Sequence, residues 1–205
     1  MHVRQAIAAL VPKLGNLRQP VIAAVNGPAS GGGLALASDI RIAAARVTFN
    51  AAFVRIGLSG CDIGVSWLLP RLIGAGRSHE LLLTGWLVDA VEADRIGLVN
   101  RVVPDDEMLD AALTTAAEIT ADSPMGVWMT KVVAWSQLEV GSLRAGIGLE
   151  NRTQIMTTFT GTTTSRSPAS SGNGPGTPPT SRNGEIGGEV DTAHSGRYVD
   201  IRGGR

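Results

Sequence analysis

Three consecutive glycines, Gly31 to Gly33, are the first residues whose type and spacing could do chemistry. They follow an apolar segment and precede residues that favour helix, so their N–H groups would lie where a helix begins. Such N–H groups lack helical partners and carry partial positive charge. Consecutive glycines cost backbone entropy, which makes sense where backbone approaches a ligand closely. We expect this turn to bind an anion or the oxygen of a polarised carbonyl. The structural alternative is a tight turn packed beneath a sheet.

A nucleotide site is a weaker interpretation of the same glycines. Gly27, Gly31 and Gly33 fit the G-x3-G-x-G pattern of short-chain dehydrogenases. That family needs a tyrosine followed four residues later by a lysine, whereas the only tyrosine here, Tyr198, is followed by Arg202. No acidic residue is well placed to bind a ribose, and no lysine follows the glycines as a phosphate loop requires.

The sequence also lacks the serine and histidine arrangement that nucleophilic hydrolysis requires. Ser59 lies in GLSGC, which misses the G-x-S-x-G pattern of hydrolases by one place. The three histidines are His2 at the start, His79 in a predicted helix and His194 near the end of the chain. None of these positions suggests a catalytic triad with the serine.

Composition narrows the classes of function. With 205 residues, 43% of them hydrophobic, the chain can bury a sizeable core. The 18 basic and 18 acidic residues leave no basic surplus for nucleic acid or an anionic membrane. The single cysteine, Cys61, excludes an internal disulfide and a cysteine metal cluster, and we single out no metal ligands. Without a signal-peptide pattern or an apolar run of about 18 residues, we expect a soluble, cytoplasmic protein.

Strands and helices are predicted to alternate around the glycine turn, which indicates an α/β fold. Strands are predicted over 21–25, 40–44, 47–50 and, as a strand or extended segment, 98–103. Helices are predicted over 5–14, 34–37, 78–84, 91–96, 105–121, 124–138 and 143–156. Residues 66–73 should kink or break at Pro70. The helix over 105–121 should turn an apolar stripe inward, formed by Met108, Ala112, Leu113, Ala116 and Ile119.

The composition changes abruptly at Thr157. Thr, Ser, Gly and Pro make up more than half of the residues from there to the end, without apolar periodicity. Such a segment cannot offset its ordering entropy, so we expect 157–205 to be disordered. Because it follows a helix without a linker and takes its bases only from arginine, we hypothesise translation out of frame; a natural disordered tail is the alternative. The expected divisions are 1–104, 105–156 and 157–205.

Three segments together resemble the crotonase superfamily, the enoyl-CoA hydratase/isomerase family. They are PVIAAVNGPASGGGLALASDIRIAA, FNAAFVRIGLSGCDIGVSWLLPRLIG and LLLTGWLVDAVEADRIGLVNRVVP, and the resemblance extends over about residues 1–156. It implies a spiral of ββα units, here incomplete at its N-terminus, followed by a helical C-terminal region that assembles homo-oligomers based on trimers. It also implies an acyl-CoA or enoyl-CoA thioester of fatty-acid metabolism as substrate, without a further cofactor.

The resemblance also implies roles for individual residues. The N–H of Gly32 matches one of the two oxyanion-hole donors of the family. Asp62, in D-x-G-x-x-x-x-L-P, matches a carboxylate of dienoyl-CoA isomerase-like members; the structural alternative is a turn aspartate that caps the helix at Gly64. Asp39 and Asp94 are expected to be structural caps or pairs. The residues implied to contact substrate are Ala29, Ser30, Gly31, Gly32, Gly33 and Phe53.

Two departures from the family pattern concern catalysis. Ala35 and Phe53 stand where the family carries its two acid/base glutamates, which position and activate water for hydration. Double-bond isomerisation is therefore favoured over hydration, and an inactive remnant that binds acyl-CoA or assembles with a full-length relative is the alternative. Family members also carry further ββα units and the other oxyanion donor ahead of the matched region, so we expect a chain truncated at its front.

Overall fold

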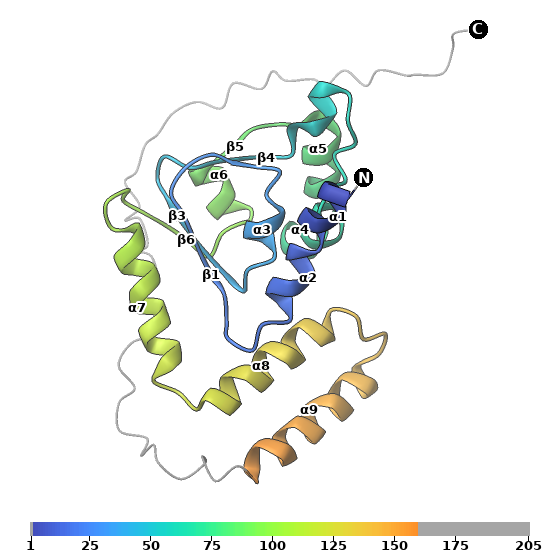
Figure 1. The fold of residues 1–205 in the computed structure, drawn as a ribbon, viewed down its shortest axis with the longest axis vertical. Coiled ribbons are helices and arrows are strands. Elements are labelled where there is room, and N and C mark those ends of the chain that lie inside the picture. Colours follow the sequence, from blue (N-terminus) through green and yellow to red (C-terminus); the bar gives the residue numbers. More distant parts are fainter. Residues whose placement is uncertain (1, 160–205) are drawn as a thin grey trace, which may run out of the picture. The chain divides into compact units, whose positions relative to one another are not determined.

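The computed structural model describes residues 2–159, with side chains from residue 5 (Figure 1). The helices are α1 (His2–Ala8), α2 (Leu10–Gly15), α3 (Gly33–Leu36), α4 (Val65–Ile73), α5 (Ala75–Thr84), α6 (Ala90–Arg95), α7 (Met108–Thr120), α8 (Pro124–Gln137) and α9 (Leu143–Thr158), with a 3-10 helix η1 (Ala52–Ile56). The strands are β1 (Ile22–Val25), β2 (Ala29–Ser30), β3 (Ile40–Ala44), β4 (Thr48–Asn50), β5 (Val88–Asp89) and β6 (Arg101–Val103).

The six strands are divided between two three-stranded sheets. The first sheet has the order β1-β3-β6 and is parallel throughout, and the second has the order β2-β4-β5, with only β5 antiparallel. The chain passes from β1 into β2 and then α3, and again from β3 into β4 and then η1 and α4. Ile22 pairs with Ile40 in one sheet, and Ala29 pairs with Phe49 in the other. Successive ββα units therefore stack in parallel, which confirms the predicted spiral.

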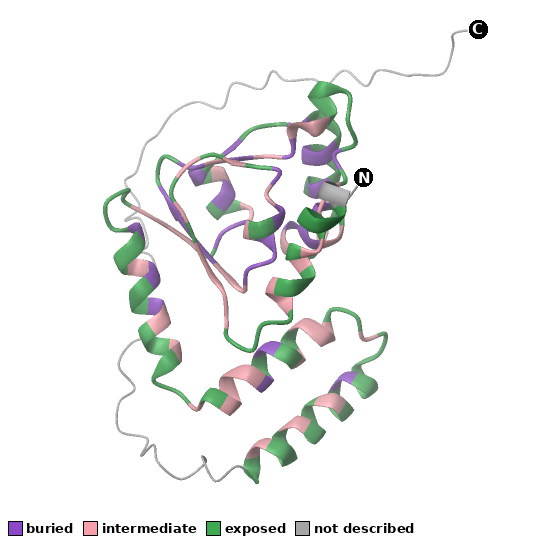
Figure 2. Ribbon diagram, viewed as in Figure 1, coloured by how far each residue is buried: buried purple, intermediate pink, exposed green. Residues whose placement is uncertain are grey.

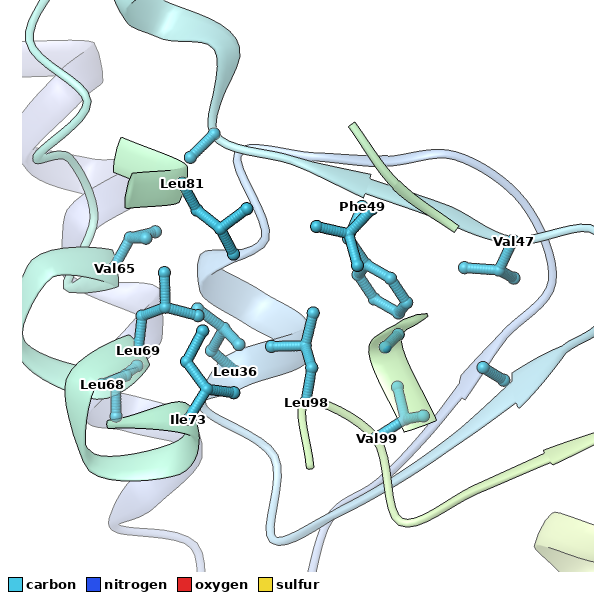
Figure 3. Close-up of a cluster of buried hydrophobic side chains, with 14 of the residues drawn as sticks. Leu36, Val47, Phe49, Val65, Leu68, Leu69, Ile73, Leu81, Leu98 and Val99 are labelled. Atoms are coloured by element: carbon cyan, nitrogen blue, oxygen red, sulfur yellow. The ribbon is translucent and has the colours of Figure 1, made fainter. Parts of the chain in front are cut away.

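The core lies between these sheets and helices α3 to α6. Strand β3 is central in its sheet, and Ile42, Ala43 and Ala44 are fully buried, as expected for a parallel strand covered on both faces. Figure 3 shows apolar side chains from several elements converging. The labelled ones are Leu36, Val47, Phe49, Val65, Leu68, Leu69, Ile73, Leu81, Leu98 and Val99.

Several helix predictions need correction. The segment 5–14 is divided between α1 and α2, with Ala9 between them. Pro70 does not end its helix, because α4 continues to Ile73. A proline inside a helix costs about 3 kcal/mol, but burying each of Leu68, Leu69 and Ile73 contributes about 1.5–3 kcal/mol. In α7, Leu113 is 58% exposed, so placing it in the inner stripe was wrong.

The strand predictions were too long in one place and missed two short strands. Residues Leu98 and Val99 form a loop, and the strand begins only at Arg101. The N–H groups of Leu98 and Val99 donate to the carbonyl of Ala93, which keeps them out of the sheet ladder. Strands β2 and β5 have two residues each, too few for an alternating pattern to appear in the sequence.

The helices after β6 form the C-terminal region. α7 packs across β1 and β3, whereas α9 packs on α8. Figure 2 shows that most of α9 is exposed. α9 continues to Thr158, so residues 157 and 158 belong to a helix and not to a tail. Phe159 follows as the C-cap of α9, and residues 160–205 of the predicted disordered segment lie outside the described residues. None of the helices within 2–159 is long and apolar enough to cross a membrane.

Candidate functional site

The glycine turn joins β2 to α3 and is shaped by left-handed backbone angles. Gly31 has φ +77° and Gly32 has φ +54°, a region that glycine adopts without steric cost. The N–H of Gly31 donates to the carbonyl of Asn50 at 2.9 Å, and the N–H of Gly33 donates to the carbonyl of Gly31 at 2.6 Å. The turn is thus fixed by one contact to β4 and one contact within itself.

The N–H of Gly32 differs from those of its two neighbours in the turn. Within the described residues it makes no backbone hydrogen bond of the kind that occupies its two neighbours. Gly32 is the N-cap of α3 and is half-buried. An N–H group held in fixed geometry, partly shielded from water, is suited to stabilise a developing negative charge. The role of Gly32 as an oxyanion donor stays a prediction.

Two other segments press directly against the turn. A Cβ atom added at Gly31 would lie 3.0 Å from Cζ of Phe53, which comes from η1. One added at Gly33 would lie 2.6 Å from Cγ1 of Ile63 and 2.8 Å from its carbonyl oxygen. Glycine is therefore required at both positions for close packing. The structure brings Phe53 and the residue after Asp62 onto the same turn.

Asp62 lies in the loop that leads into α4. Its carboxylate accepts a hydrogen bond from the N–H of Ile63 at 3.0 Å, and its carbonyl accepts one from Val65 at 2.9 Å. Ile63 has φ +39°, an outlier for a β-branched residue, and such strain is concentrated at functional sites. The half-buried carboxylate of Asp62 thus lies one residue before Ile63, the strained residue that contacts Gly33.

The two positions expected to have lost a carboxylate lie beside the turn. Ala35 is half-buried in α3, two residues after Gly33, and the Phe53 ring covers Gly31. A methyl group and a phenyl ring can neither accept nor donate a proton, so neither can activate water. Ala29 and Ser30 form β2 and pair with β4, which places them at the entry to the turn.

A buried polar cluster joins this region to the C-terminal helices. Asp39 accepts hydrogen bonds from Val21 N–H at 2.7 Å and Trp135 Nε1 at 2.6 Å, and pairs with Lys131 Nζ at 2.9 Å. Lys131 also donates to the carbonyls of Leu14 and Gln19. The prediction that Asp39 is a structural pair is confirmed. Its partner Lys131 was missed, because an isolated lysine in a helix carries no sequence signal for a contact so far along the chain.

Next to this cluster, Arg41 is buried in β3. Its Nε donates to the carbonyl of Leu98 and its Nη1 to the carbonyl of Ser38, both at 2.8 Å. Burial lowers the pKa of Arg41, and the nearby charge of Asp39 opposes that effect. These contacts fix the loop before β6 and leave Arg41 a structural residue.

Comparisons with known proteins show which family this chain resembles. A family model described as enoyl-CoA hydratase/isomerase matches residues 2–167. A Mycobacterium tuberculosis protein named "Probable enoyl-CoA hydratase EchA12" is 50% identical over 144 residues, which cover 69% of this chain and 50% of that protein. A Dictyostelium discoideum protein named "Probable enoyl-CoA hydratase, mitochondrial" is 41% identical over 142 residues, covering 68% of this chain and 50% of its own length.

Solved structures give the same result. A "probable enoyl-CoA hydratase/isomerase" from Mycobacterium abscessus has a TM-score of 0.75 and 38% identity, covering 77% of this chain and 62% of that one. A "monofunctional enoyl CoA isomerase" from M. smegmatis has a TM-score of 0.64 and 47% identity, covering 69% and 67%. The chain spans about half the length of the curated relatives it matches. It belongs to the enoyl-CoA hydratase/isomerase family of the crotonase superfamily.

Proposed function

We propose that this chain binds an enoyl-CoA and moves its double bond, with Gly32 as oxyanion donor and Asp62 as the proton carrier. The observation that carries the proposal is the junction at Gly33. There the loop of Asp62 packs onto the turn that presents the Gly32 N–H. An anion-stabilising donor and a carboxylate are the two groups that a proton transfer next to a carbonyl requires.

The reaction is balanced without a cofactor. The Asp62 carboxylate removes a proton from the carbon next to the thioester of a 3-enoyl-CoA, and the electron pair moves onto the thioester oxygen. The N–H of Gly32 donates to that oxygen while it is negatively charged. Asp62, now a carboxylic acid, returns the proton to the fourth carbon. The thioester carbonyl re-forms, and the double bond is left between the second and third carbons. The product is the conjugated 2-enoyl-CoA, and water takes no part.

The residues at positions 35 and 53 disfavour hydration. Adding water across a double bond needs groups that position the water and transfer its proton. Ala35 and Phe53 stand where such groups are expected, and neither has a proton to transfer. The printed title of the M. smegmatis neighbour, an isomerase, is consistent with this choice.

A second candidate is an acyl-CoA binder without activity. It is favoured by the hydrogen bond from the N–H of Gly31 to Asn50, which leaves the N–H of Gly32 as the donor that the turn could offer. The Phe53 ring lies against Gly31. Loss of one oxyanion donor typically lowers turnover by about 10²–10³. Such a chain would bind acyl-CoA, or assemble with a full-length relative, and would not convert its ligand.

The test measures conversion of 3-enoyl-CoA to 2-enoyl-CoA by the purified chain. We expect turnover that falls about 10²–10⁴-fold in Asp62→Asn, because the amide cannot carry the proton. Asp106→Asn, an exposed aspartate outside the site, should retain the original rate. Crotonyl-CoA should not be hydrated. Equal rates for Asp62→Asn and the unaltered chain would refute the role of Asp62, and a thermal shift with acyl-CoA but no turnover would favour the inactive binder.

A further inference from the structure

The edge of β1 that faces away from β3 carries backbone groups that could bind a further strand. The N–H of Ile40 donates to the carbonyl of Val21, so the backbone groups of Val21 point toward β3. Because these directions alternate along a strand, the N–H and C=O groups of Ile22 and Ala24 point to the opposite edge. Within residues 2–159 no other segment forms backbone hydrogen bonds with that edge.

The sequence of β1 does not protect this edge. Edge strands are usually blunted by lysine, proline, a bulge or a covering segment. The strand has the sequence Ile-Ala-Ala-Val, without charge or proline, and Ala24 is exposed. An edge of this kind is a template on which an extended polypeptide can add a strand.

Hollows flank the open edge on both faces of the sheet. One, of about 390 Å³, is lined by residues 21 and 23–29 together with Leu34 and Ala35 of α3. The other, of about 540 Å³, is lined by Ile22 with residues of α7 and α8. Neither is lined by a residue of β3, and α3 and α7 lie on opposite sides of β1 (Figure 1). A strand placed beside β1 would direct its side chains into the two hollows by turns.

The lining of the hollows indicates which side chains would fit. Among the described residues, none that lines the hollow beside α3 is charged, and Leu34 there is 46% exposed. The hollow beside α7 has one charge of each sign, Arg18 and Asp122, and is otherwise mostly apolar. An uncharged segment with large apolar side chains fits both hollows. A second copy that paired through its own β1 would fit worse, because its alanine side chains are too small to fill them.

We propose that the open edge of β1 binds an extended, uncharged segment of another protein, which adds a strand to the sheet. The backbone groups of Ile22 and Ala24 supply the hydrogen bonds, and the two hollows select large apolar side chains at alternate positions. A segment of about five residues is long enough to cover the edge. The inference is independent of the proposed function, because it uses neither Gly32 nor Asp62.

The first experiment measures binding of a fluorescein-labelled peptide by fluorescence anisotropy. The peptide has a core that alternates valine with leucine and a lysine at each end. We expect the unaltered chain to bind it and Ala24→Pro to bind at least about tenfold more weakly. The proline removes the outward N–H and leaves the bonds to β3 intact, because proline is tolerated where the N–H of an edge strand faces solvent. Ala24→Ser keeps the N–H and should bind as the unaltered chain does.

A second peptide tests the same hydrogen bonds without altering the protein. It has the same side chains, but every amide of its core is N-methylated, so it offers no donor to β1. We expect it to bind at least about tenfold more weakly than the first peptide. Equal binding of the two peptides would mean adsorption to apolar surface and would overturn the proposal, even if Ala24→Pro fails to fold. No binding of the first peptide, or equal binding by Ala24→Pro, would also overturn it.

Hydrogen exchange shows whether the edge is free to bind a partner. The amides of Ile22 and Ala24 should exchange fast in the chain alone and at least about tenfold more slowly with the first peptide bound. Slow exchange in the chain alone would overturn the proposal, because the edge would already be covered. Protection that disappears on dilution would then identify a second copy as the occupant, and protection that persists would identify residues 160–205 of the same chain.

Discussion

At the scale of single residues, the glycine turn is crowded on both sides, and the crowding determines its chemistry. Phe53 and Ile63 contact the turn from later segments of the chain, the segment of Ile63 being the more distant of the two. A methyl group at Gly33 would meet a backbone carbonyl, which cannot move aside as a flexible side chain can. The requirement for glycine here was predictable from the sequence. The residues that impose it were not, because they are brought to the turn by the fold.

Ser78 offers a stability test at the same scale. It is fully buried in α5, and its hydroxyl has no hydrogen-bond partner within the described residues. A buried hydroxyl without a partner costs about 1–3 kcal/mol, so Ser78→Ala should raise the free energy of unfolding by about 1 kcal/mol or more. Denaturant unfolding measures this change. Ser136→Ala is the matched control, because that helical hydroxyl is bonded to the carbonyl of Val132. A less stable Ser78→Ala would show that the hydroxyl has a partner.

At the scale of elements, α8 is attached to the sheet by a buried ion pair. The side chain of Lys131 is 3% exposed and that of Asp39 is 16% exposed. Removing one partner of a buried pair leaves an uncompensated charge and costs about 3–5 kcal/mol. Asp39→Ala should therefore lower the free energy of unfolding by about that amount. Adding Lys131→Met should recover part of the loss, since the stranded charge is then gone.

The control for this pair is an exposed one. Arg46 Nε and Asp105 Oδ2 lie 3.9 Å apart, and their side chains are 60% and 43% exposed, so Asp105→Ala should cost about 1 kcal/mol or less. All variants are compared by urea denaturation monitored in the far ultraviolet. A cost for Asp39→Ala no larger than for Asp105→Ala would contradict the attachment of α8 through this pair.

Elements with a local signal could be predicted, and those that depend on distant contacts could not. The apolar run of β3 and the serine cap of α8 at Ser123 are encoded within a few residues. The continuation of α4 through Pro70 depends on how deeply its leucines are buried, which only the assembled core determines. The same holds for the site. Gly32 and Asp62 were predicted from motifs that resemble those of the family, whereas the contact between Ile63 and Gly33 required the fold.

At the scale of the whole molecule, surfaces remain that another polypeptide could cover. Within residues 2–159, β1 pairs only with β3, so its other edge presents unpaired backbone groups. α9 exposes several apolar side chains, of which Leu143 is 80% exposed, and Phe159, directly after the helix, is 85% exposed. Exposed apolar surface of this kind is typical of association sites. In the homo-oligomer implied by the family resemblance, another copy of the chain could cover the apolar side chains of α9.

We therefore predict that the chain self-associates through α9 and that charge on this helix weakens the association. Ile155 and Met156 are 59% and 53% exposed, so Ile155→Glu with Met156→Glu should leave the fold intact. Light scattering should then give the monomer mass for the variant and a multiple of it for the unaltered chain. Leu109→Glu, at a 58% exposed position of α7, should not change the mass. If the unaltered chain is monomeric at all concentrations, α9 forms no contact between copies, and its apolar side chains require another explanation.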